Sequence, residues 1–229
     1  MRLGILADAH GNLAGLRSCL HFLQQQSVDH YLFLGDATGY FPQNAAVCEL
    51  LTALPLTLIA GNHEGMLMGE LPMSDTMKEV IRPPETNNTT VGHWLQRCAQ
   101  TGPIYDLEVG GKRLRLVHGS PDDPWSGHID HLAVSYTEGC DVLLSGHTHR
   151  PCINNLSTGQ LYVNPGSCGY PRDNGAWLSL AVLDTTDLHA QIFRLPNRID
   201  IGTLQWLHPA VRKTLQRKFP VMGTIVEAS

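Results

Sequence analysis

Leu3-Gly4-Ile5-Leu6-Ala7-Asp8-Ala9-His10 opens the chain with a short apolar run that ends on polar side chains. A run that is apolar on both faces is typical of a strand in a parallel sheet. Asn12 then offers an N-cap, and leucines at helical spacing over 13–23 predict an amphipathic helix. The alternation continues with further elements expected at 31–34 (strand), 42–54 (helix) and 56–60 (strand). This opening therefore predicts a βαβαβ unit with parallel strands.

The second half of the chain is richer in strand patterns. Apolar runs at 105–109 and 114–117 flank Gly110-Gly111, which indicates a hairpin. Additional strands are expected at 142–144, 161–163, 178–183 and 190–195. A parallel half followed by an antiparallel half predicts two packed sheets with helices outside them.

The chain of 229 residues has the length of one domain, which we place at 1–196. Residues 197–229 are expected to form a C-terminal amphipathic helical extension packed on the same domain, with Leu204, Leu207, Val211 and Leu215 at helical spacing. Residues 65–103 interrupt the alternation and hold four methionines and a predicted helix at 94–99. This segment is a candidate cap over the site; the alternative is a set of short helices whose methionines fill the core.

Composition describes a globular protein, because 42% of the residues are hydrophobic and only 16% are charged. The net charge of −5 disfavours nucleic acid as a partner. We see no signal peptide and no apolar run of the roughly 20 residues that a membrane span needs, so we expect a cytoplasmic protein without a membrane partner. The six cysteines form no C-x-x-C pair, which indicates free thiols and not a disulfide framework or structural zinc site.

Five short polar motifs stand where predicted strands end. They are Asp8-Ala9-His10, Gly35-Asp36, Gly61-Asn62-His63-Glu64, His118-Gly119 and Gly146-His147-Thr148-His149. Taken singly, each has a structural explanation: Asp8 as a turn cap, Asn62 as a loop hydrogen bond, His118 as a core histidine. Together they are harder to explain in that way, because the carboxyl ends of strands in open α/β sheets meet at a shared crevice. We therefore expect these residues to lie together.

The side chains of these motifs suit metal ions. Mn²⁺, Fe²⁺, Ni²⁺ and Zn²⁺ accept carboxylate, amide and imidazole ligands, and the motifs supply two Asp, one Asn and four His of this kind, with His63 in addition. Seven ligands are too many for one zinc ion but suit two ions that share a bridging carboxylate. Two such ions acidify a bridging water and clamp the attacking and leaving oxygens of an in-line displacement. The set predicts a dinuclear centre that acts on a phosphate ester.

The ordered motifs resemble the calcineurin-like metallophosphoesterase superfamily, over residues 8–173. The resemblance is closest to a branch of small, mostly prokaryotic phosphoesterases or phosphodiesterases, and it rests on Gly35-Asp36-Ala37-Thr38-Gly39-Tyr40, Asn164-Pro165-Gly166-Ser167 and Pro171-Arg172-Asp173. It implies an α/β fold of four layers, an αββα sandwich of two mixed β-sheets flanked by helices.

The same resemblance implies a division of roles among the motif residues. The first metal would be bound by Asp8, His10, Asp36 and His149, and the second by Asp36 as the bridge, Asn62, His118 and His147. His63 would not bind metal; it would face the substrate and give a proton to the leaving oxygen or stabilise the transition state. Arg172 is a candidate for contacting the substrate phosphate, with structural pairing as the alternative.

Two positions depart from the pattern of members that resemble protein phosphatases. Those members carry an acidic residue three places after the Gly-Asp aspartate, where Gly39 stands here, and a basic residue before Gly-Asn-His, where Ala60 stands. A close protein-phosphatase mechanism is therefore in doubt. We assign structural roles to Glu64 and Ser167. Among the remaining histidines, His128 and His131 follow the His118 loop and are the first candidates to line the pocket, with surface or core positions as the alternative.

We therefore expect a metal-dependent phosphoesterase in which a metal-bridging hydroxide attacks phosphorus in line. The substrate is a phosphodiester or a phosphomonoester, and the alternatives within the enzyme class are a nucleotide or a phosphoprotein. A different class, a non-catalytic protein-interaction scaffold on the same fold, predicts missing ligands, and none is missing here.

Overall fold

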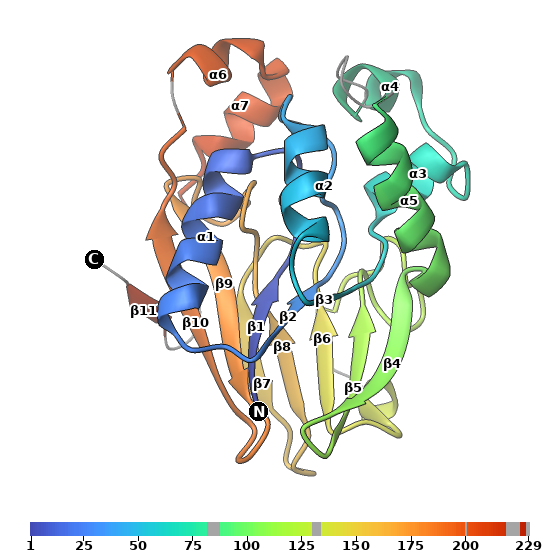
Figure 1. Ribbon diagram of the computed structural model, residues 1–229, viewed down its shortest axis with the longest axis vertical. Helices are drawn as coiled ribbons and strands as arrows, with labels where there is room; N and C mark the ends of the chain where they lie inside the picture. The colour runs from blue at the N-terminus through green and yellow to red at the C-terminus, as the bar shows by residue number, and fades with distance from the viewer. Residues whose placement is uncertain (82–87, 130–133, 200, 219–224, 228–229) are drawn as a thin grey trace.

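The computed structural model describes residues 1–81, 88–129, 134–199, 201–218 and 225–227 and places two mixed β-sheets face to face (Figure 1). The first sheet has the strand order β11 (Ile225–Glu227), β10 (His189–Pro196), β9 (Trp177–Asp184), β1 (Arg2–Leu6), β2 (His30–Phe33) and β3 (Leu56–Leu58). The second has the order β4 (Ile104–Val109), β5 (Lys112–Val117), β6 (Val142–Ser145), β8 (Leu161–Asn164) and β7 (Cys152–Asn155).

Helices α1 (Leu13–Gln25), α2 (Asn44–Thr52) and α5 (Thr89–Thr101) cover the outer face of the first sheet (Figure 1). Asn12 caps α1 as predicted, since its side chain accepts a hydrogen bond from Gly15 N at 2.9 Å. The shorter helices are α3 (Asn62–Met68), α4 (Asp75–Ile81), the 3-10 helix η2 (Val134–Thr137), α6 (Ile201–Trp206) and α7 (Pro209–Leu215).

Side chains of β1 alternate between two hydrophobic cores, as the period of a strand requires. Leu3 and Ile5 face the second sheet, where they join the core between the sheets. Leu6 belongs to the other core, under the helices. The first sheet thus has an apolar layer on each of its faces, and the carboxyl ends of its parallel strands lie at one edge.

The outer face of the second sheet carries the fourth layer. Val117, Leu143 and Tyr162 are buried there, and Tyr136 of η2 packs against them. This layer is thin in the part of the chain that the structure describes, because the short helix η2 takes the place of long helices there. The predicted four-layer αββα sandwich is confirmed.

Strand directions differ from the expected division into a parallel and an antiparallel half. In the second sheet β5, β6 and β8 run parallel, whereas the hairpin of β9 and β10 returns to the first sheet and pairs antiparallel with β1. Each sheet is therefore mixed. In the first sheet β1, β2 and β3 run parallel at one end, and in the second the parallel strands β5, β6 and β8 lie between the antiparallel edge strands β4 and β7. The predicted hairpin of β4 and β5 is confirmed by the pairing Val109↔Lys112. Gly110 and Gly111 have φ of 59° and 72°, in the left-handed region that a two-residue hairpin turn needs.

Two strands and one helix break were not predicted. β7 and β11 are short strands at sheet edges, and the exposed Asn154 and Asn155 of β7 hide its strand character from an apolar pattern. The expected C-terminal amphipathic segment is split into α6 and α7, because Pro209 begins a new helix capped by the His208 side chain. Leu207 and Val211 are buried against Phe41, so these helices lie beside the loop that follows β2.

The segment 65–103 contributes α5 to the helix layer. Trp94 of α5 is fully buried, and its ring meets that of Phe33 edge to face at 5.8 Å between centroids. The predicted helix at 94–99 is thus part of the core packing of the first sheet. Residues 82–87 of this segment lie outside the described residues.

All six cysteines are free thiols, as predicted, and five of them are buried. None of the described helices has both the length and the apolar character that crossing a bilayer requires.

Candidate metal centre and active site

The five sequence motifs meet at the edge where the parallel strands end. Asp8 follows β1, Asp36 follows β2, His118 follows β5, and the motif of His147 follows β6. Backbone hydrogen bonds tie these loops together: Asp8 N donates to Gly35 O at 3.0 Å, and Gly146 N donates to His118 O at 3.0 Å. The sheet edge therefore brings together residues that are distant in sequence, as expected.

The backbone at this edge is unusual. Seven non-glycine residues in the described chain have positive φ, and five of them are Asp8 (56°), His10 (48°), Asp36 (58°), His147 (61°) and His149 (57°). Such conformations are uncommon outside glycine and cluster at functional sites, where the surrounding structure holds them. The strained positions and the sequence motifs thus indicate the same site.

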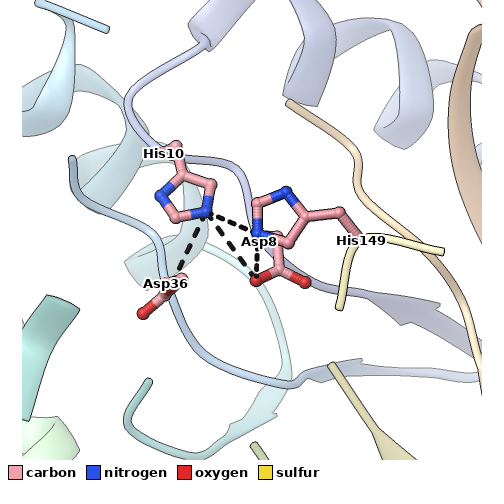
Figure 2. A group of neighbouring side chains, drawn as sticks. All are labelled: Asp8, His10, Asp36 and His149. Atoms are coloured by element: carbon pink, nitrogen blue, oxygen red, sulfur yellow. Dashed lines mark hydrogen bonds and ion pairs between the residues drawn. The ribbon is translucent and has the colours of Figure 1, made fainter. Parts of the chain in front are cut away.

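Four of the predicted residues form one buried cluster (Figure 2). Asp8, His10, Asp36 and His149 each offer a ligand atom, and these atoms lie within 4.8 Å of one another. His149 Nε2 is 3.3 Å from Asp8 Oδ1, and His10 Nε2 is 3.6 Å from Asp36 Oδ2. The side chains of Asp8 and His10 have no exposed surface.

A second group lies on the other side of Asp36. Asn62 Oδ1 is 3.1 Å from His118 Nε2 and 3.0 Å from His147 Nδ1. His118 Nε2 is 3.5 Å from Asp36 Oδ2, the same oxygen that approaches His10. Asp36 therefore stands between the two groups. The structure brings together all seven residues that the resemblance implied as metal ligands.

Three of the histidines are oriented by backbone carbonyls. Their Nδ1–H groups donate to the carbonyl oxygens of Thr38 (from His10, 3.2 Å), Leu34 (from His118, 2.6 Å) and Tyr170 (from His149). A carbonyl on Nδ1 fixes the tautomer that leaves the Nε2 lone pair free, which is the usual support of a metal-binding imidazole. The Nε2 atoms of these rings consequently face the two groups.

The positions of the donor atoms suit the binding of a cation better than they suit hydrogen bonds among the side chains themselves. His10 Nε2 and His149 Nε2 lie 3.1 Å apart, so two lone pairs face each other when both Nδ1 atoms carry the proton. Neither carboxylate oxygen of Asp8 has a hydrogen-bond partner. Burying polar groups without hydrogen-bond partners costs free energy, unless a proton or an ion lies between them. Oxygen and imidazole nitrogen are suitable ligands for a divalent transition metal ion.

Burial and charge shift the pKa values of these groups in different directions. Burial raises the pKa of Asp8 well above its usual value, and burial lowers that of His10 well below. Burial acts to lower the pKa of His118, but the charge and hydrogen bond of Asp36, with the charge of Asp8 and the Leu34 carbonyl, together raise this pKa to about 9. For Asp36, burial acts to raise the pKa, but the charges of His63, His118 and His10 and the hydrogen bond from His118 together hold it well below the usual range. The Asp36–His118 pair is thus ionised at neutral pH.

His63 lies next to Asp36 but outside both groups. Its backbone N–H donates to Asp36 Oδ1 at 2.8 Å, and its Nε2 is 3.9 Å from Asp36 Oδ2. The same Nε2 lies 3.3 Å from the hydroxyl of Tyr40. Burial lowers the pKa of His63.

Glu64 and Ser167 have the structural roles assigned to them. The buried Glu64 carboxylate accepts from Asp36 N (2.8 Å), Gly61 N (3.0 Å) and both donors of Thr38. It therefore ties together the loops after β2 and β3. Ser167 Oγ donates to Asp8 O at 2.8 Å and holds the loop after β1.

The side chain of Arg172 also lies at the sheet edge where the motifs meet. It donates to His147 O at 3.4 Å and to Tyr40 Oη at 3.3 Å, and its guanidinium lies 5.7 Å from the ring centroid of Tyr170. The neighbouring Asp173 pairs with Arg194 at 2.7 Å and not with Arg172. No carboxylate of the described residues lies within ion-pairing distance of Arg172.

Sequence reasoning missed Tyr40 and Tyr170, whose rings lie 4.6 Å apart beside His10. Tyr40 belongs to a quoted motif, but nothing in a single tyrosine distinguishes a site residue from a core one. His128 lies against His147, with ring centroids 5.3 Å apart. His131 lies outside the described residues.

The family model of the calcineurin-like phosphoesterase superfamily domain matches residues 1–188. The chain belongs to this superfamily. Among relatives of this phosphoesterase, an uncharacterized protein of Methanocaldococcus jannaschii is 25% identical over 84% of this chain and 86% of its own. A phosphodiesterase of the same organism is 23% identical over 74% of this chain and 86% of its own.

Solved structures of similar fold include a metallophosphoesterase from Sphaerobacter thermophilus, with a TM-score of 0.73 and 24% identity over 94% of this chain and 98% of that chain. An archaeal phosphodiesterase has a TM-score of 0.55 and 20% identity over 85% of this chain and 99% of that chain. At these identities the likeness shows the fold. Superfamily membership makes this chain a phosphoesterase hydrolase and implies divalent metal ions and a phosphoester substrate. The cluster of Asp8, His10, Asp36 and His149 fits such a metal site.

Proposed function

We propose that this phosphoesterase hydrolyses a phosphodiester or phosphomonoester at a dinuclear metal centre. The observation that supports the proposal is the position of Asp36, whose Oδ2 lies 3.6 Å from His10 Nε2 and 3.5 Å from His118 Nε2. One carboxylate between two sets of ligand atoms is the arrangement that two neighbouring ions require.

The residues divide into two sets. The first ion would be held by Asp8, His10, Asp36 and His149, and the second by Asp36, Asn62, His118 and His147. The ligand set of oxygen and imidazole nitrogen suits Mn²⁺, Fe²⁺, Ni²⁺ or Zn²⁺. When bound, two such ions would supply hydroxide at neutral pH for in-line attack on phosphorus and neutralise charge on the phosphoryl oxygens.

Two further side chains would act on the substrate directly. His63 carries Nε2 at the edge of the site, 3.9 Å from the bridging carboxylate; there it would give a proton or a hydrogen bond to the leaving oxygen. Arg172, which has no carboxylate partner among the described residues, would hold a non-bridging phosphoryl oxygen.

The type of phosphoester that is hydrolysed is a separate question from the type of reaction. A relative is named a phosphodiesterase, which supports a diester as the first substrate to test. A metal site recognises the phosphoryl group and not its substituents, so nucleotides and phosphoproteins stay as alternatives. The scaffold alternative has less support, because all seven ligand positions are filled. We keep a cytoplasmic location as a prediction.

Hydrolysis of bis-p-nitrophenyl phosphate and of p-nitrophenyl phosphate with added Mn²⁺, before and after EDTA, tests the function. We expect turnover of at least one ester, lost with EDTA and restored by metal. Absence of metal-dependent turnover of both esters contradicts the proposal.

Two substitutions test the division of roles. Asp36→Asn should weaken the binding of both ions, whereas His63→Ala should keep both ions and lose turnover. Asp106→Asn is a matched control, because Asp106 pairs with Arg115 on the surface at 2.8 Å. Metal content measured after dialysis tests whether His63 binds metal. Loss of the metal ions from His63→Ala would show that His63 is a ligand.

A further inference from the structure

Tyr40 lies between a metal-site histidine and the candidate acid. Its ring centroid is 4.5 Å from that of His10 and 4.8 Å from that of His63. The ring of Tyr170 packs on it at 4.6 Å. The backbone is fixed as well, since Phe41 N donates to His10 O at 2.8 Å. The ring of Tyr40 is therefore held in a defined place at the edge of the site.

The hydroxyl of Tyr40 joins two residues of the proposed mechanism. Tyr40 Oη lies 3.3 Å from His63 Nε2 and 3.3 Å from Arg172 Nη2. A guanidinium only donates, so Oη accepts from Arg172. Oη keeps one proton and one lone pair for His63, and it contacts the ring nitrogen that faces the site.

The Nδ1 edge of the His63 ring, opposite Nε2, lies against the backbone of Gly39. A Cβ at Gly39 would lie 2.3 Å from His63 Nδ1, and Gly39 has φ +140°. No side chain at position 39 fits while His63 keeps this place. A side chain at position 39 therefore cannot hold the His63 ring in place, whereas the Tyr40 hydroxyl contacts the ring at its Nε2 edge.

We propose that Tyr40 is a positioning residue: its hydroxyl holds Nε2 of His63 at the edge of the site and joins it to Arg172, until the leaving-group oxygen takes the place of Oη on that nitrogen. The proposal rests on the proposed function, since it needs a leaving group and a phosphoryl group. Without the hydroxyl, the His63 ring loses its partner at Nε2 and Arg172 Nη2 loses an acceptor. The ring of Tyr40 only fills space and would do so equally well as phenylalanine.

Steady-state kinetics of Tyr40→Phe provide the first test. We expect kcat to fall about tenfold, the rate equivalent of one hydrogen bond that no longer holds the His63 ring in its reactive position, with metal content unchanged. The loss should be larger for a phenyl ester than for a p-nitrophenyl ester, because the poorer leaving group needs more assistance. Tyr31→Phe is the matched control: Tyr31 is a buried tyrosine at the start of β2, at the end away from the site.

A double-mutant cycle separates positioning of His63 from a general structural role. If Tyr40 acts through His63, Tyr40→Phe/His63→Ala should be no slower than His63→Ala alone. Effects that multiply in the double variant would overturn the proposal, as would a Tyr40→Phe enzyme with wild-type kcat for both esters.

A measurement without turnover keeps the inference separate from the proposed function. Long-range ¹H–¹⁵N spectra of the metal-free protein report the tautomer of each histidine ring, with His63 assigned by its loss in His63→Ala. We expect Tyr40→Phe to shift the His63 signals and Tyr31→Phe to leave them unchanged. An inactive wild-type enzyme would contradict the proposed function alone; unchanged His63 signals in Tyr40→Phe would contradict the positioning role.

Discussion

Metal binding should release a proton from His118, and its affinity should therefore depend on pH. In the metal-free protein the charge of Asp36, 3.5 Å away, raises the pKa of His118 to about 9 against the effect of burial. An ion bound to His118 Nε2 must displace that proton. The same pair stabilises the metal-free fold below the ordinary histidine pKa of 6.5, and this contribution is lost as the pH rises through about 9.

The magnitude follows from the distance between pH and pKa. At pH 7 roughly one His118 in a hundred is neutral, which weakens apparent metal affinity ~100-fold, or about 3 kcal/mol, relative to a pH above 9. Affinity should rise about tenfold per pH unit between 6 and 8 from this proton alone. A proton on Asp8, whose pKa burial raises, would steepen the rise.

Calorimetric titration with Mn²⁺ in buffers of different ionisation enthalpy, such as PIPES and Tris, counts the protons released. At least about one proton per protein is expected at pH 7. An NMR titration of the metal-free protein gives the pKa of His118 directly, and Asp36→Asn should lower it below the ordinary value because burial then dominates. Zero proton release, with an affinity that is flat from pH 6 to 8, would refute the reasoning.

Three other substitutions have expected outcomes. Gly39→Ala should displace His63 and His10, whose Nδ1 atoms would lie 2.3 Å and 2.9 Å from the new Cβ; turnover and metal content should both fall, and both are measured on the purified variant. Glu64→Gln should lower stability by roughly 1–3 kcal/mol, because one amide edge cannot accept from the buried donors; urea unfolding measures it, and an unchanged midpoint would contradict the role. Trp94→Ala should cost about 3–5 kcal/mol in the same assay, since the ring is fully buried in the helix layer; a smaller loss would make α5 peripheral.

Sequence patterns predicted the parallel opening and the convergence of the five motifs, because both depend on local periodicity and on strand ends. They did not predict the sheet to which β9 and β10 belong, since an apolar strand carries no mark of its partner. The edge strand β7 was missed because its two asparagines are exposed.

The residues of the site were also predicted only in part from the sequence. Metal-ligand types are recognisable from residue chemistry, whereas the role of Tyr40 depends on a contact with His63 that only the folded loops create. Gly39 was noted as an absent acidic residue. The structure adds that this position has no room for any side chain, since a Cβ would lie 2.3 Å from His63 Nδ1.

The left-handed backbone at Asp8, His10, Asp36, His147 and His149 has a consequence for mutagenesis. Alanine in such a conformation costs roughly 1–2 kcal/mol, whereas asparagine adopts it routinely. An alanine scan of this edge would therefore combine the loss of a ligand with a distortion of the loop that carries it. Asparagine keeps the loop conformation at these five positions, so a difference in unfolding free energy between the metal-free Asn and Ala variants at one position measures what the loop itself contributes.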